Sequence, residues 1–153
     1  METGVCVFDI DGTVTPNKHL TQSHKKDGKA AVITVVNQCK TNGYKIAINT
    51  ARPHITKSMQ KYLTTIGINL TDLPQGAVQT GKITSHSKQN ALETIQYTYG
   101  IINPDNILFF DDRAKNILAA KNAGFFGMQI VGGMISDTTV DAGKNYFNTR
   151  NLK

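Results

Sequence analysis

The stretch VCVFDIDGTVTP, residues 5–16, places two aspartates one residue apart directly after a run of apolar side chains. Residues 5–8 are β-branched, aromatic or otherwise apolar, which is typical of a strand buried on both faces of a sheet. Asp9 and Asp11 would then lie at the carboxyl end of that strand, where open α/β sheets bind ligands. Asp and Gly also form ordinary turns, so the motif alone leaves a simple strand-to-turn exit open. A calcium loop does not fit, because its twelfth position, normally Glu, is Leu20.

The composition indicates a single domain that spans residues 1–153, long enough to bury a hydrophobic core. The longest strongly apolar stretch, residues 30–36, is far too short to cross a bilayer, and the first residues lack an export signal. Cys6 and Cys39 are not clustered, and we interpret them as free thiols of a reducing compartment. These observations predict a soluble, cytoplasmic protein with no membrane partner.

Strand-like and helix-like patterns alternate along the chain, which predicts an α/β fold of βα units around a mainly parallel sheet. The expected strands span residues 4–8, 45–49, 77–79, 107–110 and 127–131. The expected helices span residues 29–42, 53–66, 88–99 and 114–123, and a glycine follows each, as C-terminal caps do. The polar tail from about residue 133 is expected to form a last edge element or a partly ordered end.

Further polar residues follow or precede these elements. Asp111 and Asp112 follow the apolar strand ILFF, where two adjacent acids indicate either a magnesium site or an ordinary helix cap. Thr50 follows the strand KIAIN and offers a hydroxyl and a backbone amide there, unless it only caps a helix that begins at Pro53. Lys88 begins a predicted helix, where a lysine is unfavourable against the helix dipole unless it binds an anion.

Four of these stretches together resemble the motifs of the haloacid dehalogenase (HAD) superfamily, and within it the phosphatases. They are DIDGT at residues 9–13, INT ending at Thr50, Lys88, and FFDD ending at Asp112, in the order that the family has. The resemblance covers the chain from Val5 to about Val131. It implies a Rossmann-like three-layer sandwich with a mainly parallel central sheet, and the hydrolysis of phosphomonoesters.

The resemblance also implies a role for each motif residue. Asp9 would be the nucleophile that forms an aspartyl-phosphate, and Asp11 the general acid and base. Thr50 and Lys88 would hold the transferring phosphoryl group. The magnesium ligands would be Asp9, the backbone carbonyl of Asp11, Asp111 and Asp112. Three carboxylates are then balanced by the metal and Lys88, so that a phosphate dianion approaches a roughly neutral site.

Two further residues are candidates for support or for substrate contact. Asn116, four residues after Asp112, would anchor Lys88 or the acid pair, or else it lies on the surface of its helix. Arg52 closely follows Thr50 and would contact substrate phosphate, unless it forms only a surface salt bridge.

The spacing of the motifs leaves little room for a cap domain. Only 36 residues separate Thr13 from Thr50, and 37 separate Thr50 from Lys88. A capless site suits phosphate on a large molecule, or a small substrate enclosed by a neighbouring subunit of a homo-oligomer. The net charge of +6 and the basic residues 16–29, which we expect to form a flap, favour nucleic acid or are simply solvated. Polynucleotide 3′-phosphatase, phosphoprotein phosphatase and a catalytically silent binding module therefore stay open as alternatives.

Overall fold

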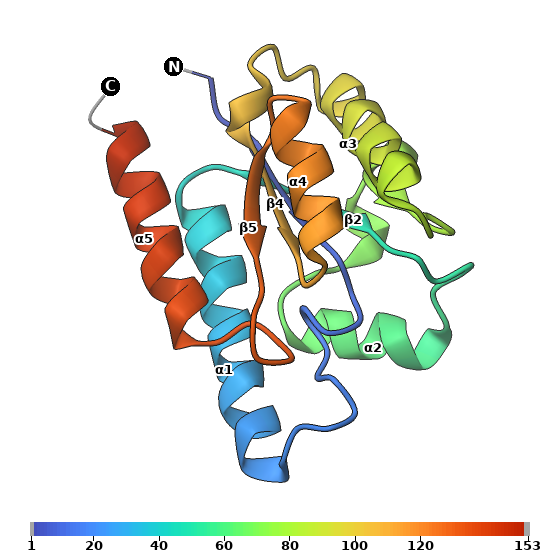
Figure 1. Cartoon of the computed structure of the whole chain (residues 1–153), viewed down its shortest axis with the longest axis vertical. Helices are drawn as coiled ribbons and strands as arrows, with labels where there is room; N and C mark the ends of the chain where they lie inside the picture. The colour runs from blue at the N-terminus through green and yellow to red at the C-terminus, as the bar shows by residue number, and fades with distance from the viewer. Residues whose placement is uncertain (1, 152–153) are drawn as a thin grey trace.

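A computed structural model describes residues 2–151 of the chain. One sheet of five parallel strands has the order β3-β2-β1-β4-β5 (Figure 1). The strands are β1 (Val5–Phe8), β2 (Lys45–Asn49), β3 (Val78–Gln79), β4 (Ile107–Asp111) and β5 (Phe126–Gln129). The α-helices are α1 (Gln22–Thr41), α2 (Lys57–Thr65), α3 (Ser85–Tyr99), α4 (Ala114–Asn122) and α5 (Asp137–Asn151). Short 3₁₀ turns lie at Leu70–Asp72, Gln75–Ala77 and Pro104–Asn106. The predicted fold class is confirmed.

The helices form two layers, one on each side of the sheet. Crossovers between parallel strands are right-handed, so the steps from β1 to β2 to β3 place α1 and α2 on one face. The chain then reverses direction to β4 and β5, which places α3 and α4 on the other face, and α5 returns to pack beside α1 (Figure 1). The reversal occurs between β1 and β4, and a crevice is expected at their carboxyl ends.

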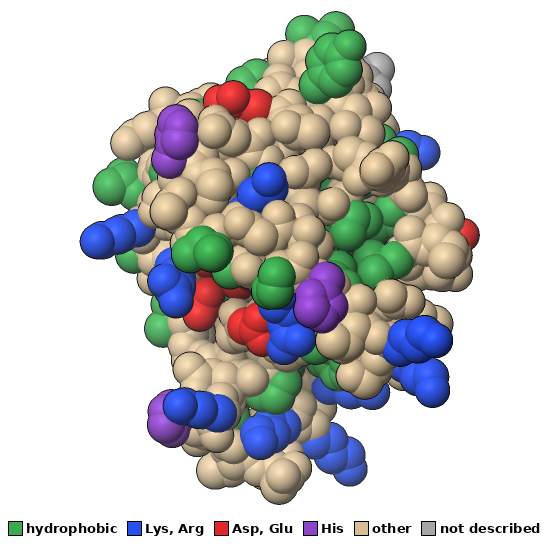
Figure 2. All heavy atoms as spheres, turned by 90° about the vertical axis from the view of Figure 1, so that its right-hand side faces the viewer, with side chains coloured by type: hydrophobic (Ala, Val, Ile, Leu, Met, Phe, Trp, Pro, Cys, Tyr) green, Lys and Arg blue, Asp and Glu red, His purple; other side chains and the backbone are tan. Residues whose placement is uncertain are grey.

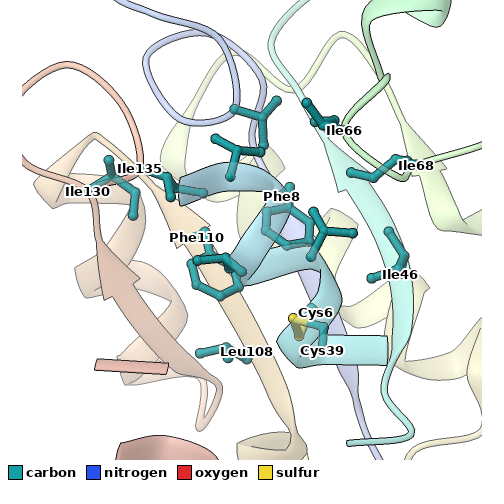
Figure 3. Close-up of a cluster of buried hydrophobic side chains, with 14 of the residues drawn as sticks. Cys6, Phe8, Cys39, Ile46, Ile66, Ile68, Leu108, Phe110, Ile130 and Ile135 are labelled. Carbon is teal, nitrogen blue, oxygen red and sulfur yellow. A yellow bond between two sulfur atoms is a disulfide. The ribbon is translucent and has the colours of Figure 1, made fainter. Parts of the chain in front are cut away.

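The alternation of side chains along the central strands divides the core in two. Phe8 and Phe110 point toward α1, with their rings stacked 4.7 Å apart (Figure 3). Val7 and Phe109 point toward α3 and α4. Because both faces of β1 and β4 are buried, these strands are apolar throughout, as a parallel sheet requires. This packing on both faces fixes where the first polar residue after each apolar run lies, which is Asp9 for β1 and Asp111 for β4.

The predicted strands and helices are all present, although three helices begin elsewhere: α1 and α3 begin earlier than expected, α3 at Ser85, and α2 begins later. Helix α1 begins at Gln22, because the side chain of Thr21 accepts a hydrogen bond from the backbone N–H of His24 and caps it. Residues 16–29 are therefore only partly a flap, since their second half is helical. Helix α2 begins at Lys57 rather than Pro53, and Thr56 caps it. The tail also differs from expectation, because residues 137–151 form the ordered helix α5, packed on α1.

The prediction that both cysteines are free thiols is wrong, because Cys6 of β1 and Cys39 of α1 form a disulfide (Figure 3). Their Cα atoms lie 6.3 Å apart although 33 positions separate them in sequence. Packing of α1 across β1 brings the two together, and sequence spacing does not reveal such a contact. The argument for a reducing compartment loses its premise, and cytoplasmic location stays a prediction. Among the described helices, none is both long and apolar enough to span a bilayer.

We expect the disulfide to stabilise the folded chain by about 3 to 4 kcal/mol, because it closes a loop of this length in the unfolded state. Replacing both residues, as in Cys6→Ala with Cys39→Ala, should lower the free energy of unfolding in urea by that amount. A reducing agent should destabilise the wild type and leave the double variant unchanged. Alkylation of the non-reduced, denatured wild type at either cysteine would contradict the assignment.

Candidate active site

Three carboxylates meet at the carboxyl ends of β1 and β4. The two strands pair in parallel with Phe8 opposite Phe110, so Asp9, which follows β1, and Asp111, the last residue of β4, lie side by side. The backbone N–H of Asp9 donates to the carbonyl of Phe110 at 3.0 Å, which extends the ladder to that point. Oxygens of Asp9, Asp111 and Asp112 all lie within 4.8 Å of one another.

Lys88 lies among these carboxylates although it comes from α3. Its Nζ lies 2.8 Å from Asp9 Oδ1 and 3.2 Å from Asp111 Oδ2, and it donates to the carbonyl of Asn49 at 2.6 Å. The side chain is 3 % exposed, so the charge is almost completely removed from water. A buried ammonium is stable only when it is paired and hydrogen-bonded, and all three partners here are oxygens. The predicted gathering of Lys88 with the acids is what the geometry shows.

Helix α3 begins in a way that places Lys88 one turn inside it. Thr84 and Ser87 form a capping box, in which each side chain accepts a hydrogen bond from the backbone N–H of the other. Asn49 also helps to hold the backbone at Lys88, since its side-chain amide donates to the carbonyl of Lys88 at 3.0 Å. Asn49 was not among the residues predicted from the sequence, although an asparagine that ends the apolar strand KIAIN is a signal of a buried polar contact.

Hydrogen bonds orient the carboxylates. Thr13, which we did not single out, donates from its hydroxyl to Asp9 Oδ2 at 3.1 Å. Asn116 donates from its side-chain amide to Asp111 Oδ2 at 3.1 Å, and the backbone N–H of Arg113 donates to Asp111 Oδ1 at 2.8 Å. Of the positions considered for Asn116, the structure places it on the acid pair and not on the surface, since it is 5 % exposed.

Gly12 allows the motif after β1 to approach Asp112. Its φ of 77° lies in the left-handed region, which side chains other than glycine rarely adopt. A Cβ atom at this position would lie 2.5 Å from Asp112 Oδ2. The glycine of DIDGT is therefore required both by the turn and by the adjacent carboxylate.

Asp11 lies apart from this cluster of acids. Its side chain is 58 % exposed, and both of its oxygens accept hydrogen bonds from Arg52, whose Nε and Nη2 each lie 2.8 Å away. The salt bridge that was one of the two alternatives for Arg52 thus exists, and its partner is Asp11, the predicted general acid and base.

Thr50 is buried beneath the cleft, with no exposed surface. Its backbone N–H donates to the carbonyl of Gln79 at 2.9 Å, so the amide that we expected to be offered to phosphate is used by the sheet. The hydroxyl accepts a hydrogen bond from the backbone N–H of Arg52 at 3.1 Å and keeps its own hydrogen. The hydroxyl hydrogen, and not the amide, is therefore what Thr50 has left to donate.

A cleft with a volume of about 530 Å³ opens over the acids. The loop after β1 and the start of α4 contribute basic side chains to its wall, namely Lys18, His19 and Arg113, and exposed Ile83 adds an apolar side chain. On the face shown in Figure 2, acidic side chains lie in a hollow with basic side chains directly beside them. The cleft therefore combines a deep acidic floor with a basic rim.

The acidic floor has perturbed proton affinities. Burial raises the pKa of the Asp9 carboxyl to about 7; Lys88 opposes this rise, and the charge of Asp111 adds to it. Burial, followed by the charge of Asp111, also raises the pKa of Asp112. Three acids with one lysine leave an excess of negative charge that a cation would neutralise. Carboxylate oxygens this close together suit a hard divalent cation, so the residues present fit one.

The parallel five-stranded sheet and the acidic cluster at its switch point define a HAD-superfamily hydrolase domain of the phosphatase class. Residues 28–149 match the family model described as Acid Phosphatase. This match covers most of the chain, which therefore belongs to that family. The matched region contains Thr50, Lys88, Asp111 and Asp112, whereas Asp9 and Asp11 precede it. The predicted family resemblance is confirmed.

Solved structures with low sequence identity share the fold. One is an uncharacterized protein from Corynebacterium glutamicum, with 17 % identity, a TM-score of 0.62 and 96 % of each chain covered. The core domain of a protein from Streptococcus pneumoniae TIGR4, provisionally named a phosphoglycolate phosphatase, has 18 % identity and a TM-score of 0.61, covering 97 % of this chain and 98 % of that one. No curated protein matches the chain significantly.

A third structure was solved with ligands. It is the 3-deoxy-D-manno-octulosonate 8-phosphate phosphatase from Moraxella catarrhalis, in complex with magnesium ion, phosphate ion and KDO. It has 15 % identity and a TM-score of 0.58, and the comparison covers 95 % of this chain and 86 % of that one.

The raised pKa values predict that the metal-free protein loses stability as the pH rises. Asp9 binds its proton more tightly in the folded chain, with a pKa of about 7, than in the unfolded chain, where its pKa has the ordinary value of 3.8. The free energy of unfolding should therefore fall between about pH 4 and pH 7, by a few kcal/mol in all. Urea unfolding in a chelating buffer measures it. Asp9→Asn should flatten the profile of stability against pH, with Asp141→Asn, at an exposed position of α5, as the control. A stability that rises across this window would contradict the prediction.

Proposed function

We propose that the chain is a magnesium-dependent phosphomonoesterase with an open active site, which acts through an aspartyl-phosphate on Asp9. One observation carries the proposal: the carboxylate of Asp9 lies on the floor of the cleft, 2.8 Å from Lys88 and clustered with Asp111 and Asp112. Membership of the Acid Phosphatase family supports the phosphatase class. A binding module that lacks catalysis would gain nothing from burying these charges together.

The residues that would hold magnesium are the carboxylates of Asp9, Asp111 and Asp112, together with the backbone carbonyl of Asp11. When bound, the metal would supply positive charge to the acids and to the phosphoryl oxygens of the substrate. Asn116 and the backbone N–H of Arg113 hold Asp111 in place for this role. A magnesium ion in the related Moraxella catarrhalis structure also favours this metal.

In the first step, a carboxylate oxygen of Asp9 attacks phosphorus and the ester P–O bond breaks. Thr13 and Lys88 fix the orientation of Asp9, since each contacts one of its two oxygens. The ammonium of Lys88 and the hydroxyl of Thr50 stabilise the negative oxygens of the transferring group. Asp11 donates a proton to the departing alkoxide, so the alcohol leaves neutral.

In the second step, water attacks the phosphorus of the aspartyl-phosphate. Asp11, now a carboxylate, removes a proton from that water. The Asp9–phosphorus bond breaks, inorganic phosphate leaves and the Asp9 carboxylate is regenerated. Asp11 thus recovers its proton with each turnover, which is why one carboxyl two residues after the nucleophile serves both steps.

The wall of the cleft limits which substrates fit this proposal. Lys18 and His19 are exposed and line the entrance, and the described chain adds no domain above them. A phosphorylated substrate can therefore approach from solvent, whether it is a small molecule or a macromolecule. The basic rim favours substrates with negative charge beyond the reacting phosphate.

Asp9→Asn should lower the kcat for an aryl phosphate by a factor on the order of 10³ or more, because an amide cannot act as the nucleophile. The fold should be retained, since an amide of equal size replaces the carboxylate. Steady-state assays with magnesium and circular dichroism measure both quantities. Asp141→Asn, the same chemical change at an exposed position of α5, is the matched control and should keep wild-type activity.

Hydroxylamine traps acyl phosphates, so a quenched reaction should label Asp9 in the wild type, as peptide mass spectrometry would show. Full activity of Asp9→Asn, or a label on another residue, would remove Asp9 from this role.

Asp112→Asn should weaken magnesium binding by about tenfold or more, because it removes one anionic ligand from the cluster. Activity should recover in part as magnesium is raised. Calorimetric titration of the metal and magnesium-dependent assays test this, with Asp141→Asn again as the control. An unchanged affinity would place the metal elsewhere.

A further inference from the structure

Arg52 occupies both oxygens of the residue that the proposed mechanism needs as its proton donor. The contacts from Nε and Nη2 to the two oxygens of Asp11 are each 2.8 Å long, which is a bidentate fork. The two residues come from different loops, after β1 and after β2. The fork takes one lone-pair site on each oxygen of Asp11 and holds the carboxylate against Arg52, so Asp11 is turned to Arg52 until at least one of these hydrogen bonds opens.

The backbones on both sides of the fork are fixed, so only the side chains can open it. The N–H of Arg52 donates to the hydroxyl of Thr50, and its carbonyl accepts from the N–H of Gly81 at 2.6 Å. On the other loop, the carbonyl of Ile10 accepts hydrogen bonds from the N–H groups of Thr13, Val14 and Thr15. A rotation of the Arg52 side chain would release Asp11 and leave both loops in place.

A second anion is the chemistry that would open the fork. A carboxylate or phosphate presents the same pair of oxygens to a guanidinium as Asp11 does. Arg52 and Asp11 are 33 % and 58 % exposed, and ion pairs exposed to this extent are weak enough for a ligand to displace them. Arg113 and Lys18 line the cleft together with Asp11, and they would attract such an anion to it.

We propose that Arg52 is a specificity-determining residue: it holds Asp11 in an idle position, and a second anionic group on the substrate draws Arg52 away and frees Asp11. The preferred substrate class is then a phosphomonoester with a carboxylate or a second phosphate a few bonds from the ester oxygen. The inference rests on the proposed phosphatase function and adds to it a substrate class and a means of selection. An ester without a second anion leaves the fork closed.

The test uses three alkyl esters of equal length: propyl phosphate, its analogue with a terminal carboxylate, and its analogue with a terminal phosphate. For the wild type, we expect at least a tenfold higher kcat/KM for one or both charged esters than for propyl phosphate, with part of the gain in kcat. A gain for only one of them distinguishes carboxylate from phosphate as the group that Arg52 receives.

Arg52→Gln should remove this preference and should raise the kcat for propyl phosphate, because Asp11 is then free. Arg113→Gln makes the same change at another arginine, which lines the cleft at the start of α4. It should lower kcat/KM for both charged esters but keep the preference for them that Arg52→Gln abolishes. If Arg52→Gln keeps the wild-type preference, or lowers the rates of all three esters equally, the proposal is overturned.

An aryl phosphate serves as the reference, because its leaving group departs without a proton. Wild-type turnover of that ester, without any preference among the alkyl esters, would overturn the role of Arg52 and leave the phosphatase proposal standing. No turnover of any ester would overturn the phosphatase proposal itself.

Discussion

The repulsion among three carboxylates at one edge of the sheet is partly offset by the ammonium of Lys88, and the neighbouring elements are placed so that this pairing can form. Asp9 and Asp111 are adjacent because β1 and β4 pair in parallel. Lys88 reaches both from α3, whose start is fixed by the capping box at Thr84. Burial raises the pKa of Asp9 and of Asp112, and the ammonium of Lys88 opposes this rise at Asp9. The strand order thus places the acids, and the start of α3 places the lysine that pairs with them.

The hydrophobic core explains why this arrangement is rigid. Side chains of β1 and β4 pack on both faces, so neither strand can slide without moving Phe8 off Phe110 or Val7 away from α3 and α4. A shift of one residue would also turn Asp9 toward the opposite face. The precision required for phosphoryl transfer is therefore supplied by apolar residues below the site.

Much of this could be predicted from the sequence, because the informative residues follow apolar strands directly. The apolar residues before Asp9 and Asp111 indicate both where each strand lies and where it ends. The acids on the floor of the cleft can therefore be predicted from the local sequence. The contacts that were missed depend on distance in space. Nothing local shows that Cys39 lies over Cys6, or that Arg52 turns back onto Asp11. The helix start at Gln22 was hidden because the polar first turns of α1 carry few buried residues.

The disulfide also determines what happens if the chain is cut. Cys6 lies just before the DIDGT motif, and Cys39 lies near the end of α1, so every peptide bond of the exposed loop at residues 16–21 falls within the covalent ring. A protease that cleaves this loop would produce two fragments that stay joined as one molecule. The strand that carries Asp9 would remain in the sheet, while the entrance to the cleft would gain two free ends. Because of the disulfide, the core can therefore stay intact when the loop beside the active site is cut.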